Sequence, residues 1–202
     1  MSHAHSPVIP RPVDAVRLDG GRLCLDFVNT IHDRYAAEQE DYLGDPKRFI
    51  AWSGRAGALL PADGVSEPRA APRRAALMEE VAALRGHLHE LFAARIDERA
   101  PRPDAVRGLD HWLHQAWTNQ TLGIDGKMHW RTGKSDPQRA LQRIALDALD
   151  LLGDPAPSRL RRCANTTSCG WLFLDVSKNG RRRWCAMETC GTAEKMQRYR
   201  RG

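Results

Sequence analysis

The sequence has no long hydrophobic run, because nowhere in its 202 residues do 18 apolar residues follow one another. Its first residues, MSHAHSPVIPRPV, also lack the apolar segment of an export signal. A membrane-spanning helix needs about 20 mainly apolar residues, and a secretory leader needs an apolar centre. We therefore expect a cytoplasmic protein without membrane contact.

Motifs typical of enzymes are missing as well. The sequence contains no glycine-rich phosphate loop, no serine-nucleophile motif and no paired-carboxylate motif. His111 and His114 lie three residues apart in a predicted helix and could share a metal, but no third ligand is near them in the sequence. We expect a protein that is not an enzyme.

Acidic residues are scarce in the last part of the chain. Residues 159–202 contain 11 lysines and arginines but only three acidic residues, a net charge of +8, whereas residues 1–158 carry a net charge of −2. Such a distribution is typical of one module that binds a polyanion beside another that does not. A solvated basic tail without a partner is the alternative.

The chain up to residue 153 is expected to be mainly α-helical after a loose lead-in, residues 1–16, and to contain a small β-hairpin. Asp45-Pro46 and Asp136-Pro137 are typical helix starts, with the aspartate as N-cap and the proline in the first turn. Asp125-Gly126 is typical of a tight type I′ hairpin turn. Leu23, Phe27 and Ile31 recur at intervals of four residues, which predicts a helix after Gly20-Gly21, with a short strand over 22–28 as the alternative. Further helices are predicted from Asp45 onward and over 73–98, 103–117 and 136–152.

One apolar seam runs along the longest predicted helix, because leucines and a valine follow one another at spacings of four and three residues. Its members are Leu77, Val81, Leu84, Leu88 and Leu91. This periodicity indicates a helix with one buried face. Two heptads are too few for a coiled coil, so we expect packing within the chain rather than against a partner helix.

Cysteines are absent from most of the chain and then gather within 28 residues, in the pattern Cys163-x5-Cys169-x15-Cys185-x4-Cys190. Clustered thiols in a reducing compartment favour metal binding over disulfides. The central spacing is typical of two zinc-binding pairs, although both inner spacings exceed the common CxxC. Cys24 stands alone, and we expect it to be a small core residue.

The segment between the cysteine pairs, WLFLDVSKNGRRRW, predicts a β-hairpin with its turn at Asn179-Gly180, followed by a helix that begins near Cys190. This order predicts a small α+β zinc module of the treble-clef type. A unit of 44 residues buries too little apolar surface to fold without a metal or another staple. Since four thiolates leave no open coordination position, we expect one structural Zn²⁺ per chain.

The basic residues around this site have two interpretations. Zn²⁺ with four thiolates carries a formal charge of −2, which one or two arginines would offset. The remaining basic residues are predicted to contact phosphates. On the predicted helix, Lys195, Arg198 and Arg201 form one basic stripe, and Ala193, Met196 and Tyr199 form an apolar side opposite to it. The candidates for nucleic-acid contact are Arg181, Arg182, Arg183, Lys195, Arg198, Arg200 and Arg201.

Two stretches resemble a known family. RRCANTTSCGWLFLDVSKNGRRRWCAMETCG closely resembles the CGNR zinc finger, and GGRLCLDFVNT resembles the opening of the ABATE domain, which precedes that finger in bacterial proteins described as stress-induced transcription regulators. The resemblance implies a treble-clef zinc module that binds DNA and an N-terminal domain that senses a ligand. The Asn and Arg that name the finger are here Thr192 and Ala193, so a DNA contact by that Arg is missing, and Thr192 is left as a helix cap at best.

The polar residues of the N-terminal motif have two possible roles. Asp26, Asn29 and Arg34 lie in or beside an apolar segment and need hydrogen-bond partners if they are buried. They are predicted to tie the first helix to its neighbours, with ligand recognition as the alternative. Four tryptophans could line a ligand pocket, but we expect most of them in the core: Trp52, Trp112, Trp117 and Trp130.

The combined prediction is a transcription regulator with an ABATE-like domain over 17–153, a short Pro-rich linker over 154–158 and a zinc module over 159–202. Its expected partners are DNA, a small ligand of the N-terminal domain and a second copy of the chain. The alternative is a zinc module for structure, dimerisation or protein interaction without DNA contact, because WLFLDV is apolar on both strand faces, as in a strand covered on two sides. RNA cannot be separated from DNA on these grounds.

Overall fold

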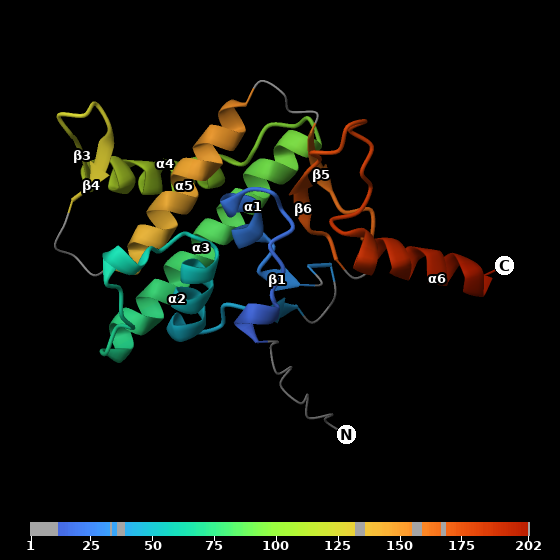
Figure 1. Cartoon of the computed structure of the whole chain (residues 1–202), viewed down its shortest axis with the longest axis horizontal. Coiled ribbons are helices and arrows are strands. Elements are labelled where there is room, and N and C mark those ends of the chain that lie inside the picture. The colour runs from blue at the N-terminus through green and yellow to red at the C-terminus, as the bar shows by residue number, and fades with distance from the viewer. Residues whose placement is uncertain are drawn as a thin grey trace.

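A computed structural model of the chain describes residues 12–32, 34–35, 39–131, 136–154, 159–166 and 169–201. For residues 194, 197, 198, 200 and 201 it describes the backbone alone. Figure 1 shows a helical body with a small C-terminal part against one side, and a last helix that extends away from both. The predicted fold class, a mainly helical N-terminal part with a small β-hairpin followed by a small α+β part, is confirmed.

The N-terminal part is built from helices, and most lie where the sequence predicts. They are α1 (Leu23–Val28), α2 (Pro46–Arg55), α3 (Ala71–Ile96), α4 (Pro103–Thr118) and α5 (Gln138–Gly153), with short 3₁₀ turns η1 (Val13–Ala15) and η2 (Pro61–Asp63). The Asp45-Pro46 start is confirmed, because Asp45 is the N-cap of α2 and accepts a hydrogen bond from the backbone N–H of Arg48 at 2.9 Å. Asp136 accepts one from the backbone N–H of Gln138 at 2.9 Å, but the N-cap of α5 is Pro137, so that helix begins two residues after its predicted start.

The predicted seam of α3 lies in the core of the chain. All five of its members are buried, and α3 packs against α1, α4 and α5. Each such side chain contributes roughly 1.5–3 kcal/mol through burial. The seam is therefore used within the chain, as predicted. Cys24 on α1 is also a core residue: it is fully buried, and burial raises the pKa of its thiol.

The chain turns away from α1 earlier than the spacing of Leu23, Phe27 and Ile31 suggests. Ile31 belongs to strand β1 (Ile31–His32), which pairs antiparallel with β2 (Glu40–Asp41). The cause is a buried guanidinium on α3: Arg85 donates to Thr30 Oγ1 at 3.0 Å and to Asp41 Oδ1 at 2.8 Å. This pairing fixes both sides of the turn and ends the helix.

The predicted hairpin is present, but the prediction of a type I′ turn was wrong. Strands β3 (Gln120–Leu122) and β4 (Met128–Trp130) pair antiparallel, and the N–H of Gly123 donates to the carbonyl of Lys127 at 2.8 Å. Three residues then remain in the loop, and only Gly126 has a positive φ, +72°. A type I′ turn needs positive φ at two central residues, whereas a three-residue loop ends in one left-handed residue.

The C-terminal part contains β5 (Leu160–Arg162), β6 (Leu172–Leu174), a π-helical turn η4 (Met187–Gly191) and α6 (Thr192–Arg201). The predicted pairing of this part was wrong. β6 pairs antiparallel with β5, before the first cysteine, and not with 181–184, which form no strand. The turn before Arg181 is present, since the N–H of Gly180 donates to the carbonyl of Ser177 at 3.2 Å.

The two parts share an interface along β6, and this explains the wrong pairing. On the edge of β6 away from β5, Asn29 donates to the carbonyl of Leu172 at 2.8 Å and accepts from the N–H of Leu172 at 2.9 Å. On the same edge, the N–H of Leu174 donates to the carbonyl of Gly20 at 2.8 Å. Both edges of the strand are therefore occupied, and no place remains for the segment after Gly180.

Apolar packing joins the parts as well. Leu172 and Phe173 of β6 are fully buried in one cluster with the core of the helical part. Trp171 donates its indole N–H to the carbonyl of Ile31 at 3.2 Å. Within the described residues, no helix combines the length and the hydropathy that crossing a bilayer requires.

Candidate metal centre and the basic surface around it

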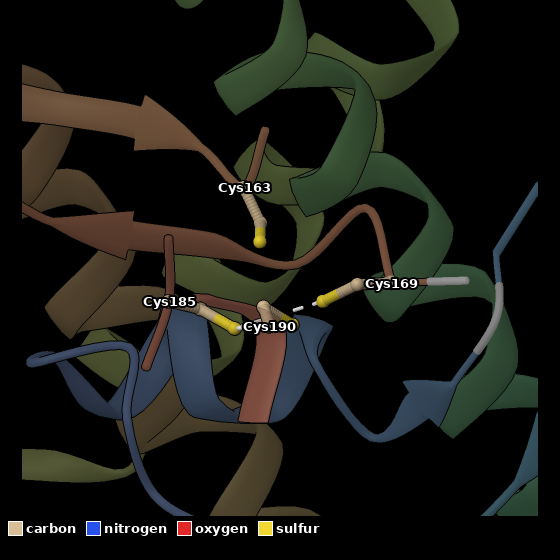
Figure 2. Close-up of side chains that lie close together, drawn as sticks. All are labelled: Cys163, Cys169, Cys185 and Cys190. Atoms are coloured by element: carbon tan, nitrogen blue, oxygen red, sulfur yellow. Dashed lines mark hydrogen bonds between the residues drawn. The ribbon is translucent and has the colours of Figure 1, made fainter. Parts of the chain in front are cut away.

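Four cysteine side chains meet at the junction of β5, β6 and the start of α6. Figure 2 shows their sulfur atoms pointing toward one another, and all four Sγ atoms lie within 4.8 Å of one another. The Sγ of Cys185 lies 3.6 Å from that of Cys169 and 3.7 Å from that of Cys190. All four residues, Cys163 included, are buried. Among the thiols themselves, the hydrogen bond with Cys169 lowers the pKa of Cys163, and the same contact raises that of Cys169.

Backbone hydrogen bonds bring the two cysteine pairs together. The N–H of Cys163 donates to the carbonyl of Trp171 at 2.8 Å, which closes the knuckle around the first pair. The N–H of Ala164 donates to the carbonyl of Arg183 at 2.8 Å, which places the second pair beside the first. Gly170 turns the knuckle with φ +71°, and a Cβ there would lie 2.4 Å from the ring of Tyr35. Glycine is therefore required at this turn.

The donor set fits one ion well. Zn²⁺ prefers four thiolates in a tetrahedral arrangement, and a closed set of four leaves no position for a substrate. The chain accordingly holds one structural Zn²⁺, bound by the four clustered cysteines, as predicted. In peptides of similar size, zinc binding contributes about 10–16 kcal/mol near neutral pH, and this free energy stabilises the fold.

The middle residue of the arginine triplet belongs to the metal centre. Arg182 donates through Nε to the carbonyl of Trp184 at 2.8 Å and through Nη2 to the carbonyl of Cys185, and its guanidinium lies 4.5 Å from the centre of the Phe173 ring. Its side chain therefore positions the loop that carries Cys185. Because two of its donor groups are used inside the module, we expect phosphate contacts from its neighbours rather than from Arg182.

A buried carboxylate shapes the loop before the triplet. Asp175 accepts hydrogen bonds from the hydroxyl of Ser177 at 2.5 Å, from its N–H at 3.0 Å and from the N–H of Arg182 at 2.8 Å. The bond from the hydroxyl of Ser177 is the main cause that lowers the pKa of Asp175. The carboxylate thus takes donors that a strand partner would otherwise take, and the chain passes to Cys185 without a second β-ladder.

Several of the other predicted cations remain on the surface. Arg181, Arg183 and Lys195 are exposed, and Arg183 lies over the ring of Trp184 at 4.9 Å from its centre. The side chains of three further candidates lie outside the described residues: Arg198, Arg200 and Arg201.

The apolar side predicted for the last helix is not buried. Met196 is 56% exposed and Tyr199 is 90% exposed. The reason is visible in Figure 1, where α6 leads away from the body after its first turn. Thr192 donates its hydroxyl to the carbonyl of Met187 in the preceding turn at 3.1 Å.

The polar residues of the N-terminal motif serve the fold. Asn29 holds the edge of β6, Asp26 accepts from the N–H of Gly20 at 2.8 Å, and Arg34 donates to the carbonyl of Val28 at 2.7 Å. Burial raises the pKa of Asp26 to about 7 and lowers the pKa of Arg34 to about 10. These contacts agree with the prediction that the three residues tie α1 to its neighbours, and none of the three lines the cavity beside Cys169, Cys185 and Cys190.

The remaining sequence candidates do not form a site within the described part of the chain. There, the four cysteines are the sole group of three or more side chains placed to hold a metal, so the pair His111 and His114 lacks a third ligand. The tryptophans are spread over the molecule, with Trp52 fully buried and Trp117 about half exposed.

Comparison with known families agrees with this geometry. The CGNR zinc finger matches residues 159–201, and the ABATE family, described as "Putative stress-induced transcription regulator", matches residues 21–155, which is more than half of the chain. A comparison with curated proteins found no match. The protein is thus a zinc-finger protein with a helical partner domain. It belongs to the ABATE family, and the finger at its C-terminal end is of the CGNR type.

Proposed function

We propose that this chain is a cytoplasmic transcription regulator, and not an enzyme, whose zinc module binds DNA. The observation that carries the proposal is the position of α6. This helix is anchored at its first turn beside Cys190 and extends away from the body, with Lys195 exposed (Figure 1). A basic helix that stands free of its own domain has the shape needed to enter a groove of a nucleic acid.

Charge supports the same function. Arg181 and Arg183 are exposed beside the metal centre, and the spacing of Lys195, Arg198 and Arg201 gives α6 a basic stripe. With Arg182 held inside the module, six candidates remain for phosphate contact. If all six bound phosphates, the logarithm of the binding constant would fall with the logarithm of salt concentration at a slope of about −5.

The test is fluorescence anisotropy with labelled duplex DNA across a salt series. Zinc-loaded protein is expected to bind with the steep slope, and protein stripped by a chelator is expected to lose binding. Arg183→Glu should weaken binding at low salt and reduce the slope by about 1 or more. Arg107→Glu, at an exposed arginine on α4 and therefore outside the module, makes the same change of charge and serves as the control.

The outcome against the proposal is equally clear. If zinc-loaded protein binds no DNA at low salt, or if Arg107→Glu weakens binding as much as Arg183→Glu, the zinc module is not the DNA-binding surface. Matched single-stranded RNA and DNA in the same series separate the two polymers.

A second candidate function is a dimerisation or docking module. The observation that favours it is the exposure of Met196 and Tyr199 on α6, because large apolar side chains on a free helix suit a protein partner. Gel filtration at low and high salt separates the functions: a dimer that does not depend on salt and carries no nucleic acid supports docking.

We also propose that the helical part senses a small molecule, as the resemblance of GGRLCLDFVNT to the opening of the ABATE domain implies. The shared interface along β6 supports this, since any change in the position of α1 moves Asn29 and with it strand β6, which lies inside the zinc module between Cys169 and Cys185. A ligand that changes DNA affinity must bind the two states of this interface with different affinities.

A further inference from the structure

A cavity of about 340 Å³ lies between the zinc module and the helical part. Residues from the lead-in, from β1, from the knuckle and from the first turn of α6 line it. Its lining includes Arg17, His32, Trp171, Thr189 and Ala193. A cavity of this size holds several small molecules, because one water molecule takes up about 30 Å³ of liquid.

The cavity reaches the metal ligands unequally. Cys169, Cys185 and Cys190 line it, whereas Cys163 does not. Cys163 follows β5 directly and is fully buried. Three of the four zinc ligands can therefore be approached from the cavity, and the fourth is protected by the protein.

We propose that this cavity makes the zinc centre a site of oxidative modification, at which a small peroxide converts Cys185 and either Cys169 or Cys190 into a disulfide and releases the zinc. The inference rests on the zinc centre and not on DNA binding. Bound thiolates are the nucleophilic form of cysteine, and the Sγ of Cys185 is already 3.6 and 3.7 Å from its two candidate partners.

The step consumes one peroxide for each disulfide. The sulfur of Cys185 attacks a peroxide oxygen, the O–O bond breaks, and the leaving hydroxide takes up a proton to become water. The thiolate of Cys169 or Cys190 then attacks the sulfenic sulfur, the S–S bond forms, and a second hydroxide leaves and is protonated. The two sulfurs lose two electrons in total, and the peroxide gains them.

Zinc release follows from the loss of ligands. A disulfide removes two of the four thiolates, and Cys163 with one remaining cysteine cannot form the closed tetrahedral set. The unequal access also predicts an order among the five cysteines of the chain. Cys163 and the core residue Cys24 should stay reduced when the first disulfide has formed.

The experiment uses the full zinc-loaded chain with hydrogen peroxide at or below one equivalent. A chromogenic chelator reports zinc release, and alkylation followed by tandem mass spectrometry locates each oxidised cysteine. We expect one zinc released per disulfide, a disulfide that contains Cys185, and alkylated Cys163 and Cys24. A first disulfide that contains Cys163 as often as the other ligands, or zinc release without any disulfide, overturns the proposal.

Access through the cavity is tested by filling it. Ala193→Phe places a ring where Ala193 lines the cavity, and should slow zinc release by peroxide several-fold. Thr192→Phe, at the exposed neighbouring position outside the cavity lining, is the matched control and should react like the wild type. Equal slowing by both variants, or by neither, contradicts access through this cavity.

A comparison of oxidants on the wild type decides the question even if Ala193→Phe does not hold its zinc. Hydrogen peroxide should release zinc much faster than cumene hydroperoxide at equal concentration, after each rate is divided by the rate with a free thiol. Equal normalised rates would show that the thiolates react at an open surface and not through the cavity.

Discussion

At the scale of single residues, Asn29 has the most specific role in joining the two parts of the chain. Its amide both donates to and accepts from the backbone of Leu172, as a neighbouring strand would. Asparagine suits this role because its side chain carries one acceptor and two donors. A polar residue at the C-terminal end of an apolar helix thus replaces a strand partner.

Replacing this side chain should destabilise the whole chain. Asn29→Ala leaves the N–H and the carbonyl of Leu172 buried without partners, and we expect a loss of roughly 2–4 kcal/mol in the free energy of unfolding. Urea unfolding of the zinc-loaded protein measures it. Asn119→Ala is the control, because the Asn119 side chain makes no hydrogen bond among the described residues, and it should change stability by less than about 1 kcal/mol. Equal effects would contradict the role of Asn29.

The buried carboxyl group of Asp26 is expected to make the stability of the fold depend on pH. Its folded pKa is about 7, above the ordinary value of 3.8. The folded state therefore holds this proton more tightly than the unfolded state, so the contribution of Asp26 to stability falls as pH rises from about 4 to about 7. Asp26→Asn keeps an acceptor for the N–H of Gly20 and should be more stable than the wild type at pH 8, on the order of 2 kcal/mol.

The measurement compares urea unfolding of wild type and Asp26→Asn, both saturated with zinc, at about pH 5.5 and pH 8. Zinc affinity changes with pH in both proteins, so the difference between them isolates Asp26. The advantage of the variant should grow with pH. An advantage that is constant over this range would mean that Asp26 is charged in both states.

At the scale of elements, the side chains of the arginine triplet 181–183 point in different directions. Arg182 points into the module and holds the loop of Cys185, whereas Arg183 lies on the surface over Trp184. Neighbouring residues of the same type thus serve the metal and the solvent-exposed face, respectively.

Replacing Arg182 and replacing Arg183 should therefore affect different properties, zinc affinity and DNA affinity, respectively. Arg182→Ala should lower zinc affinity by about 10–100-fold, as loss of groups that orient metal ligands does, and should lower thermal stability with it. Arg183→Ala should keep its zinc and lose only affinity for DNA. Competition with a chromogenic chelator measures zinc affinity, and anisotropy measures DNA binding. If both variants bind zinc equally well, the loop of Cys185 does not depend on Arg182.

Elements with strong local signals could be predicted from the sequence. The seam of α3 and the Asp-Pro starts of α2 and α5 depend on residues within one helix, and their positions were correct to within two residues. The zinc ligands could also be predicted from the sequence, because the residue type and the spacing of Cys163, Cys169, Cys185 and Cys190 are typical of a zinc site.

Elements that depend on distant partners could not be predicted in the same way. The apolar segment of β6 was correctly predicted to be a strand, but its hydrogen-bonding partners are β5 and Asn29, and Asn29 lies 143 residues away from Leu172. The role of Arg182 was hidden for the same reason, since no pattern distinguishes it from Arg181 and Arg183. The sequence signal for Asn29 was its polarity inside an apolar segment.

At the scale of the whole molecule, the helical part and the zinc module share one apolar cluster. Removal of zinc should therefore weaken both. We expect a chelator to lower the melting temperature of the helical signal at 222 nm by about 10 °C or more, which corresponds to a loss of a few kcal/mol in a chain of this size.

Calorimetry of the same samples gives the control. Zinc-loaded protein should unfold in one transition, because the parts support each other across β6. Two separate transitions, with the larger one unaffected by the chelator, would mean that the helical part is stable without the module. Cys24→Ser should not change the response to the chelator, because Cys24 lies in the core and outside the metal centre.

The hydrogen bonds of Asn29 also have a consequence for biosynthesis. Asn29 leaves the ribosome long before Leu172, which follows 143 residues later. At a translation rate of about 5–20 residues per second, this interval lasts roughly 7–30 s. During that time the side-chain amide of Asn29, at the end of α1, lacks the backbone of Leu172 as its partner, and the apolar surface beside it is not yet covered by β6. The nascent chain is therefore expected to need chaperone protection until the zinc finger has emerged and taken up its metal.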